Sequence, residues 1–325
     1  MVSIFREKSI FSFLLLIIVA GVLYAPVINK APHLIVLHTD GFIFYLLNGL
    51  AELPSDFAIF SFLFLKLLTA LFINYIVSDI KLFSKTAFIP ALSFLLLSAI
   101  LPSWMQLSPA FYACILLSLI YYSSVRLYNA LKPQSAIYNL GLITGSSILL
   151  YYPMLPTILV AFYALSVTRP FKMSEWFLLL MGLLTPLYFL LGYLFLTDQL
   201  ALVHNWYTIF TIAPVLDKEI QTTAIGLSVA AIFIVYGLIL AEQTSAQYSI
   251  LSRKAKAILY ISFLAFMPVV FFIKDSYPHA ILLLTVPGSI LLSYCFLQIK
   301  NRYITALIFW ILVGLTIYIH WGFGK

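Results

Sequence analysis

The chain has 325 residues, of which 63% are hydrophobic and only 9% are charged, and its formal net charge is +7. This number of polar side chains is too small to cover the surface of a soluble protein of this size. The composition therefore excludes a soluble enzyme and predicts an integral membrane protein. The basic residues stand in twos and threes between apolar runs, an arrangement that orients membrane spans in the lipid bilayer and argues against nucleic acid as a partner. No domain boundary is visible, so we expect a single transmembrane domain over residues 1–325.

Apolar runs of about 17 to 20 residues, long enough to cross a bilayer as helices, follow one another along the chain. They cover residues 10–28, 57–77, 86–101, 109–125, 176–196, 223–241, 257–273, 281–299 and 303–319. The first run lacks a clear cleavage site with small residues, so we interpret it as a retained span and not as a signal peptide. The runs predict an all-α, polytopic membrane protein.

Residues 34–50 form a shorter and ambiguous run. As a span, they would place the acids Glu52 and Asp56 in the cytoplasm. They would also move Lys81 and Lys85 to the outside, against the rule that basic loops stay inside. We therefore expect a loop and an interfacial helix on the outer surface after the first span.

Asp40 stands in this first outer loop, two residues after His38 and directly before Gly41. A carboxylate at the edge of lipid loses hydration, which raises its pKa and prepares it to act as a general base. We therefore select Asp40 and His38 as catalytic candidates. The alternative is structural, because Asp is a favoured N-cap for a helix that would start near Phe42. The two side chains could share a divalent metal, but no third ligand stands at helical spacing, so we predict no metal site.

Lys66 lies near the middle of the span over residues 57–77. A lysine at this depth costs about 2.5–3.5 kcal/mol on an insertion scale, which the many Leu, Ile, Phe and Val residues of the span offset. We expect its side chain to face the protein interior and to bind the phosphate or carboxylate of a substrate. The alternatives are that the side chain snorkels to the membrane surface or that the span has different ends.

Residues 140–165 could form one tilted span or two short helices that reverse at Pro153 and Pro156. One span would place the basic loop at residues 126–132 on the opposite side from the basic loop at residues 169–172. Two helices keep both loops on one side. Proline removes a backbone donor and disfavours helix just before it, so we predict a helix hairpin.

Residues 274–279 form a short polar outer loop before a span that is interrupted at Pro287. Lys274, Tyr277 and His279 are candidate ligands for a substrate phosphate at the membrane surface. The alternative is an ordinary tight loop without a ligand.

Together these elements give about 11 transmembrane helices, with the N-terminus in the cytoplasm and the C-terminus outside. The compact loops suit the cytoplasmic (inner) membrane of a bacterium. All five histidines and most acidic residues then fall outside, so we expect acid–base chemistry on the outer face. No cofactor-binding motif is present, and we predict no cofactor.

Three features taken together resemble the polytopic type-C glycosyltransferases, which use polyprenyl-phosphate-linked sugars as donors. They are the first outer loop with Asp40 in HTDGFIFY, the glycine-containing hairpin over residues 138–165, and the basic loop and proline-containing span over residues 274–292. The resemblance implies that Asp40 is the catalytic base and that Lys274 or His279 binds the donor phosphate. The chain departs from the family in lacking a second acid in the first loop and an arginine in the late loop.

We therefore expect this chain to transfer a sugar or similar headgroup from a lipid-phosphate carrier to an acceptor at the outer face. Two other functions stay open. The first is a non-catalytic subunit or scaffold of a membrane or envelope complex, whose protein partners the sequence does not name. The second is a carrier or flippase, which would depend on Lys66.

Overall fold

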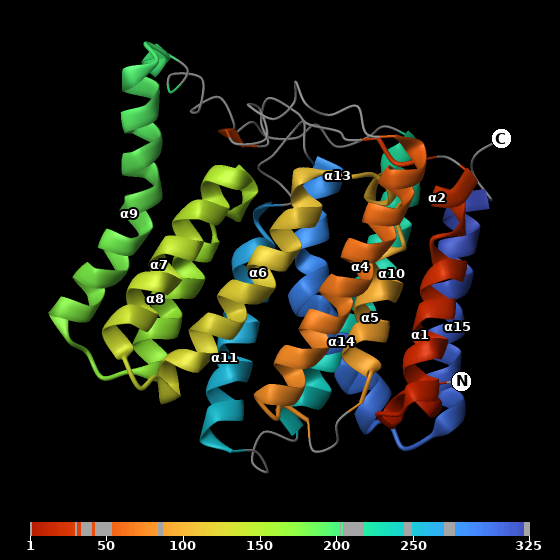
Figure 1. Cartoon of the computed structure of the whole chain (residues 1–325). Helices are drawn as coiled ribbons and strands as arrows, with labels where there is room; N and C mark the ends of the chain where they lie inside the picture. The colour runs from red at the N-terminus through yellow and green to blue at the C-terminus, as the bar shows by residue number, and fades with distance from the viewer. Residues whose placement is uncertain are drawn as a thin grey trace.

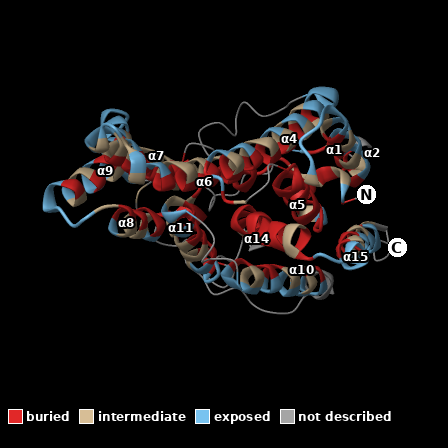
Figure 2. Ribbon diagram, turned by 90° about the horizontal axis from the view of Figure 1, so that it is seen from below, coloured by how far each residue is buried: buried red, intermediate tan, exposed pale blue. Residues whose placement is uncertain are grey.

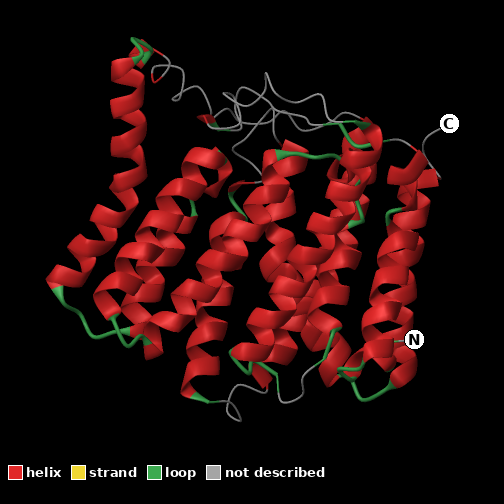
Figure 3. Cartoon of the chain, viewed as in Figure 1, coloured by secondary structure: helices red, strands yellow, loops and turns green. Residues whose placement is uncertain are grey.

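The computed structural model describes residues 2–29, 31–33, 41–42, 54–83, 87–201, 203, 218–243, 249–269 and 277–321. Across these residues all regular structure is helical, and no strand is present (Figure 3). The α-helices in chain order are α1 (Ile10–Leu23), α2 (Ala25–Asn29), α4 (Ser55–Asp79), α5 (Ile89–Ser98), α6 (Pro109–Arg126), α7 (Pro133–Leu150), α8 (Thr157–Thr168), α9 (Met173–Leu196), α10 (Lys218–Gln243), α11 (Ile250–Phe266), α13 (Tyr277–Ala280), α14 (Thr285–Gln298) and α15 (Arg302–Trp321). Short 3-10 helices lie between them, of which η3 (Pro102–Met105), η5 (Tyr152–Met154) and η8 (Ile281–Leu284) bear on the site.

The longer helices stand side by side in a bundle and run alternately up and down along the chain (Figure 1). Viewed along the bundle, α5 and α14 lie in the middle, and helices including α1, α4, α6, α10 and α11 surround them (Figure 2). The span Ile281–Gln298 is accordingly 83% buried inside the protein, whereas Met173–Leu196 at one edge is 17% buried. The apolar side chains that α9 leaves uncovered are those that a lipid-facing helix would present.

Within the described residues, six helices are long and apolar enough to cross a membrane. They cover Ser55–Asp79, Pro109–Asn129, Met173–Leu196, Ala224–Gln243, Ile281–Gln298 and Arg302–His320. The sequence-based expectation of about 11 spans is therefore corrected for the described part of the chain. For three helices the reason is length: α1 has 14 residues, α5 has 10 and α8 has 12. At a rise of about 1.5 Å per residue, a 10-residue helix covers about 15 Å, half of a bilayer core of about 30 Å.

The predicted helix hairpin within residues 140–165 is confirmed. Helix α7 ends at Leu150, Tyr151 is extended, and α8 begins at Thr157 after the single 3-10 turn of η5. The break expected at Pro287 lies slightly earlier, where η8 gives way to α14 at Thr285. Pro287 itself lies in the first turn of α14, where a missing backbone donor costs little. The interfacial helix predicted over residues 34–50 lies outside the described residues, apart from Gly41 and Phe42.

Glycines bring α7 and α9 into backbone contact. A Cβ atom on Gly141 would meet the carbonyl oxygen of Leu179, and a Cβ atom on Gly182 would meet that of Tyr138. Gly145, one turn further along α7, is blocked in the same way by Leu183. Small residues at this spacing let helices approach closely, which is a common way to pack helices within lipid.

Charge is distributed unevenly between the two ends of the bundle. Apart from Lys66 and Lys218, every basic residue in the described part of the chain lies at or within two turns of the lower end in Figure 1. These residues are Arg6, Lys8, Lys81, Arg126, Lys132, Arg169, Lys172, Arg253, Lys254, Lys256, Lys300 and Arg302. The upper end carries α13 with His279 and the last turn of α15 with His320.

Candidate functional site

Lys66 lies on the inner face of α4, inside the bundle. The residue is 0% exposed, and the apolar residues Phe62 and Ala70 on the same helix face are equally enclosed. It stands 11 positions after Ser55, the first residue of α4, which is about 16 Å along the helix. The side chain therefore faces the protein interior, and the alternative that it snorkels to the membrane surface is wrong.

Aromatic rings surround the Lys66 ammonium group. Its Nζ atom lies 4.6 Å from the ring centroid of Phe111, 5.5 Å from that of Phe62, 5.8 Å from that of Tyr24 and 6.0 Å from that of Phe94. Tyr24 directly follows α1, and Phe62, Phe94 and Phe111 belong to α4, α5 and α6. These four helices therefore meet around the Lys66 ammonium group. The faces of aromatic rings attract a cation, and this attraction is strongest where water is excluded.

The ring of Tyr24 is held in place by hydrogen bonds to α5. Its hydroxyl oxygen lies 2.8 Å from Ser98 Oγ and donates to the carbonyl oxygen of Leu95 at 3.2 Å. The same ring packs edge-on against Phe62, with centroids 5.7 Å apart. The aromatic cage, which we define as Tyr24, Phe62, Phe94 and Phe111, is thus fixed by packing and hydrogen bonding before any ligand binds.

No counter-charge accompanies Lys66 within the described residues. Its Nζ atom has no hydrogen-bond partner there. The ion pairs that the described residues form, Arg126–Asp79 and Arg169–Glu175, lie at the lower end of the bundle. The predicted phosphate or carboxylate partner of Lys66 is therefore not supplied by this part of the protein. A buried cation without a partner is costly, so an anion placed beside Lys66 would be stabilising.

The N-terminus of α6 adds to this positive charge. Phe111, whose ring is nearest to Lys66, lies in the first turn of α6, and Pro109 occupies its first position. A helix N-terminus carries about half a positive charge and free backbone N–H groups, so it attracts anions and disfavours a nearby cation. Two positive groups therefore meet at this point of the bundle.

Ser108 is the N-cap residue of α6, and its hydroxyl group has no partner. The backbone of Ser108 is extended (φ −127°, ψ 157°), as in an ordinary N-cap, yet its side chain makes no capping hydrogen bond. The residue is 2% exposed, and its Oγ atom lacks a hydrogen-bond partner among the described residues. Buried hydroxyl groups are nearly always hydrogen-bonded, so the Ser108 hydroxyl is free to bond to a group outside the described residues.

His279 lies on α13, which contacts both α6 and η3 at the upper end of the bundle. The residue is 9% exposed, and its Nδ1 atom is buried without a partner in the described structure. Burial lowers the pKa of His279 below its usual value of 6.5, because the charged imidazolium loses hydration. We define the α6 site as Lys66, Ser108, Phe111 and His279.

The remaining predicted site residues lie in or next to the segments before Gly41 and before α13. His38, Asp40 and Lys274 lie outside the described residues. Tyr277 belongs to α13, but its side chain is likewise outside the description. Gly41, which follows Asp40, packs against the end of α7, where an added Cβ atom would meet the carbonyl oxygen of Leu150.

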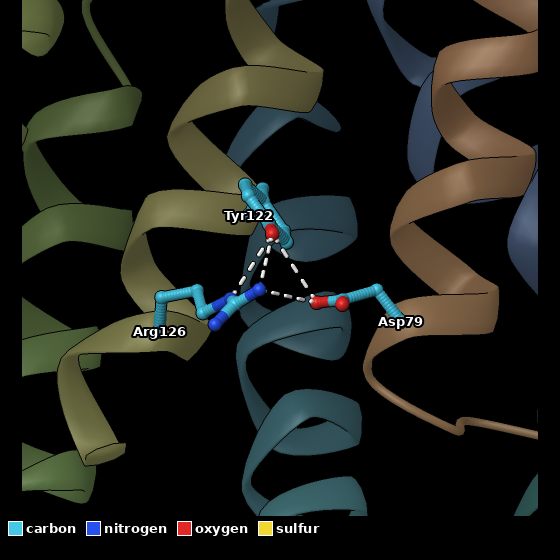
Figure 4. A network of polar contacts seen from close by, with 3 residues as sticks. All are labelled: Asp79, Tyr122 and Arg126. Carbon is cyan, nitrogen blue, oxygen red and sulfur yellow. Dashed lines mark hydrogen bonds and ion pairs between the residues drawn. The ribbon is translucent and has the colours of Figure 1, made fainter. Parts of the chain in front are cut away.

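A second polar cluster joins α4 and α6 at the lower end (Figure 4). Arg126 Nη2 lies 2.9 Å from Asp79 Oδ2 and donates to the hydroxyl oxygen of Tyr122 at 2.7 Å. Tyr122 in turn donates to Asp79 Oδ2 at 3.2 Å. The Arg126 and Asp79 side chains are 55% and 29% exposed, which makes this cluster a surface clasp between helices. No group of three His, Cys, Asp or Glu able to hold a metal occurs in the described ranges.

Of the residues of the α6 site, Lys66 and His279 are among those predicted from the sequence, whereas Ser108 and the aromatic cage are not. The Ser108–Pro109 pair is a recognisable helix start, since serine is a favoured N-cap and proline a favoured first residue. That signal predicts a capped helix, and it does not reveal a hydroxyl group left without a partner. The cage residues are ordinary aromatic positions in α4, α5 and α6 and directly after α1, so only their proximity in space reveals the cage.

No family model, curated protein or solved structure matches this chain.

Proposed function

We propose that this chain is a multi-pass membrane protein that transfers a sugar or similar headgroup from a lipid-phosphate carrier to an acceptor. The reaction would occur at the end of the bundle opposite the basic loops. Six apolar helices support residence in a bilayer. The observation that carries the proposal is the Lys66 cation, which is fully buried beside the N-terminus of α6 without an anion in the described structure.

In this mechanism the lipid-linked phosphate supplies the missing negative charge. Asp40 removes the proton from the acceptor hydroxyl, whose oxygen then attacks the headgroup carbon bonded to the phosphate oxygen. The bond between this carbon and the phosphate oxygen breaks, and the electron pair leaves with the phosphate. Lys274 and His279, aided by Tyr277, stabilise the departing phosphate, while Lys66 provides the deeper positive charge.

The position of the flanking residues supports placing Asp40 at this end. Gly41 packs against the upper end of α7, and α13 with His279 lies at the upper end as well. Gly41, which follows Asp40, and α13, which begins three residues after Lys274, therefore lie at one end of the bundle. A catalytic base and a phosphate ligand have to share one end to act on one substrate.

Deletion of the gene, followed by mass spectrometry of surface glycans and polyprenyl-linked intermediates, tests the reaction. We expect a surface glycan to be lost and its lipid-linked precursor to accumulate. Wild-type protein should restore the product, and Asp40→Asn and Lys66→Met should not. Lys254→Met, which removes a partly buried lysine at the lower end, should restore it. If deletion left the glycans and their precursors unchanged, the transfer reaction would be contradicted. The remaining functions would then be a scaffold or a carrier.

The orientation in the membrane is also part of the proposal, with the basic end in the cytoplasm and the C-terminus outside. Two exposed leucines in the turns on either side of α7 make a matched pair, Leu131 at the lower end and Leu155 at the upper end. The native Cys114 and Cys295 are buried and should not react. In intact cells a membrane-impermeant thiol reagent should label Leu155→Cys and spare Leu131→Cys. The reverse pattern would place the site in the cytoplasm.

A further inference from the structure

Buried polar groups without a partner lie at the start of α6 and on α13, which contacts both α6 and the preceding η3. The Ser108 hydroxyl and the His279 Nδ1 atom are buried and have no partner among the described residues. By helix geometry the N–H of Ala110, in the first turn, has no acceptor within the helix, and Pro109 has no N–H. Each buried polar group of this kind costs about 1–3 kcal/mol if it stays without a hydrogen bond.

The same region concentrates positive charge. The Lys66 ammonium group lies against the ring of Phe111, three residues after Ser108, and the positive end of the α6 dipole is directed to this turn. A cation next to a helix N-terminus is unfavourable on its own, whereas an anion between the two would be attracted by both. The aromatic cage holds the lysine in place in the absence of that anion.

We propose that the N-terminal turn of α6 is a binding site for a phosphate group. The phosphate oxygens accept hydrogen bonds from the Ser108 hydroxyl, the Ala110 amide and His279, and Lys66 neutralises the charge. A phosphate suits the site better than a carboxylate, because it offers enough oxygens to serve all these donors at once. The proposal rests on the proposed function in that the phosphate would belong to the lipid-linked donor, although free phosphate offers the same chemistry.

Ser108 is the residue that distinguishes this site from a simple buried lysine. Because its side chain makes no capping bond, Ser108→Ala should cost the unliganded protein little stability. Ser108→Asp should have the opposite effect. Aspartate is a good N-cap and brings its own negative charge to Lys66, so it should stabilise the unliganded protein and occupy the phosphate position.

The experiment uses the full chain, purified in a maltoside detergent and phosphate-free buffer. The probes are farnesyl phosphate, farnesol and inorganic phosphate, and the readouts are the binding constant from calorimetry and the shift in unfolding temperature. We expect farnesyl phosphate to bind and stabilise the wild type and farnesol to do neither. Ser108→Ala and His279→Gln should each weaken binding about tenfold or more. Ser108→Asp should abolish binding while raising the unfolding temperature without ligand.

Ser124→Ala is the matched control, because Ser124 is also a buried serine of α6 whose hydroxyl has no partner in the described structure, but near the other end of the helix. It should bind farnesyl phosphate like the wild type. The phosphate site would be contradicted if Ser108→Asp bound farnesyl phosphate as tightly as the wild type. It would also be contradicted if Ser108→Ala and Ser124→Ala lost equal binding affinity. Binding of inorganic phosphate as strong as that of farnesyl phosphate would support the site and identify free phosphate as its source. The binding and deletion experiments can also disagree. If the wild type binds farnesyl phosphate, the variants show the expected losses and gene deletion changes no glycan, the phosphate site is supported and only the transfer reaction is contradicted.

Discussion

The ammonium nitrogen of Lys66 lies 4.6 Å from the centroid of the Phe111 ring, inside the bundle and without a counter-ion among the described residues. Two effects of opposite sign act on this lysine. Placing it at this depth costs about 2.5–3.5 kcal/mol on an insertion scale. Contact with the rings returns about 2 kcal/mol where water is excluded. The sum of the two effects is unfavourable by about 1 kcal/mol, so Lys66 lowers the stability of the folded protein.

Lys66→Met should therefore stabilise the protein and remove its activity. Methionine has a similar length and fills the space within the cage, and we expect the free energy of unfolding to rise by about 1 kcal/mol. Denaturant unfolding in detergent measures the gain. Lys254→Met is the control, since Lys254 also lies over a ring, that of Tyr128 at 4.3 Å, but at the lower end of the bundle. If Lys254→Met raised the free energy of unfolding by the same amount, burying Lys66 inside the bundle would carry no particular energetic cost.

Stability should fall as the pH is lowered from 7 towards 5, and His279 should cause part of this loss. Burial holds the pKa of His279 below its ordinary value of 6.5, so the unfolded chain binds a proton at a higher pH than the folded protein does. The loss begins near the unfolded pKa of 6.5 and continues until the folded pKa is reached. Unfolding measured at a series of pH values should show a shallower decline for His279→Gln than for the wild type. Parallel curves would contradict the assignment.

Gly182→Ala should separate α7 from α9. The added Cβ atom would meet the Tyr138 carbonyl oxygen and would lie 3.2 Å from the Cα atom of Gly141, and neither backbone atom can move without shifting a helix. We expect a loss of about 1–3 kcal/mol in unfolding free energy. Gly192→Ala on the same helix is the control, because nothing lies within 4 Å of its Cβ position. It should be neutral or gain up to about 1 kcal/mol from better helix propensity.

Arg6→Gln should loosen the N-terminal segment from the end of α14. Arg6 donates from Nε and Nη2 to the carbonyl oxygen of Phe296, at 3.2 and 2.7 Å, and from Nη2 to that of Ile299 at 3.0 Å. These carbonyl groups lie at a helix C-terminus, where a cation is favoured. We expect a loss of about 1–3 kcal/mol. Arg6→Lys should recover only part of it, because a lysine cannot reproduce the planar fork. Thermal unfolding compares the variants, and the exposed Lys8→Gln should change little.

The Asp79–Arg126 clasp should contribute little to stability. Both side chains are partly exposed, so water screens their attraction. A double-mutant cycle with Asp79→Asn and Arg126→Gln should give a coupling of about 1 kcal/mol or less, and high salt should reduce it further. A larger coupling that persists in high salt would mean that the clasp is shielded in the membrane-embedded protein.

The helical class, the place of the hairpin and the inward direction of Lys66 could all be predicted from the amino-acid sequence. Each of these follows from short-range rules: apolar length, proline geometry and the cost of a cation in lipid. The number of long spans escaped sequence reasoning, because an apolar run does not reveal where its helix ends, and α5 has only 10 residues.

The surroundings of Lys66, in contrast, depend on how the helices pack. Tyr24, Phe94 and Phe111 are far apart in the chain and come together because α1, α4, α5 and α6 pack at one point. The lack of a partner for Ser108 is also a tertiary fact, since a hydrogen bond depends on which atoms lie within about 3 Å and not on residue type. Periodicity selects the face that a helix buries, but the neighbours on that face are set by the packing of the whole bundle.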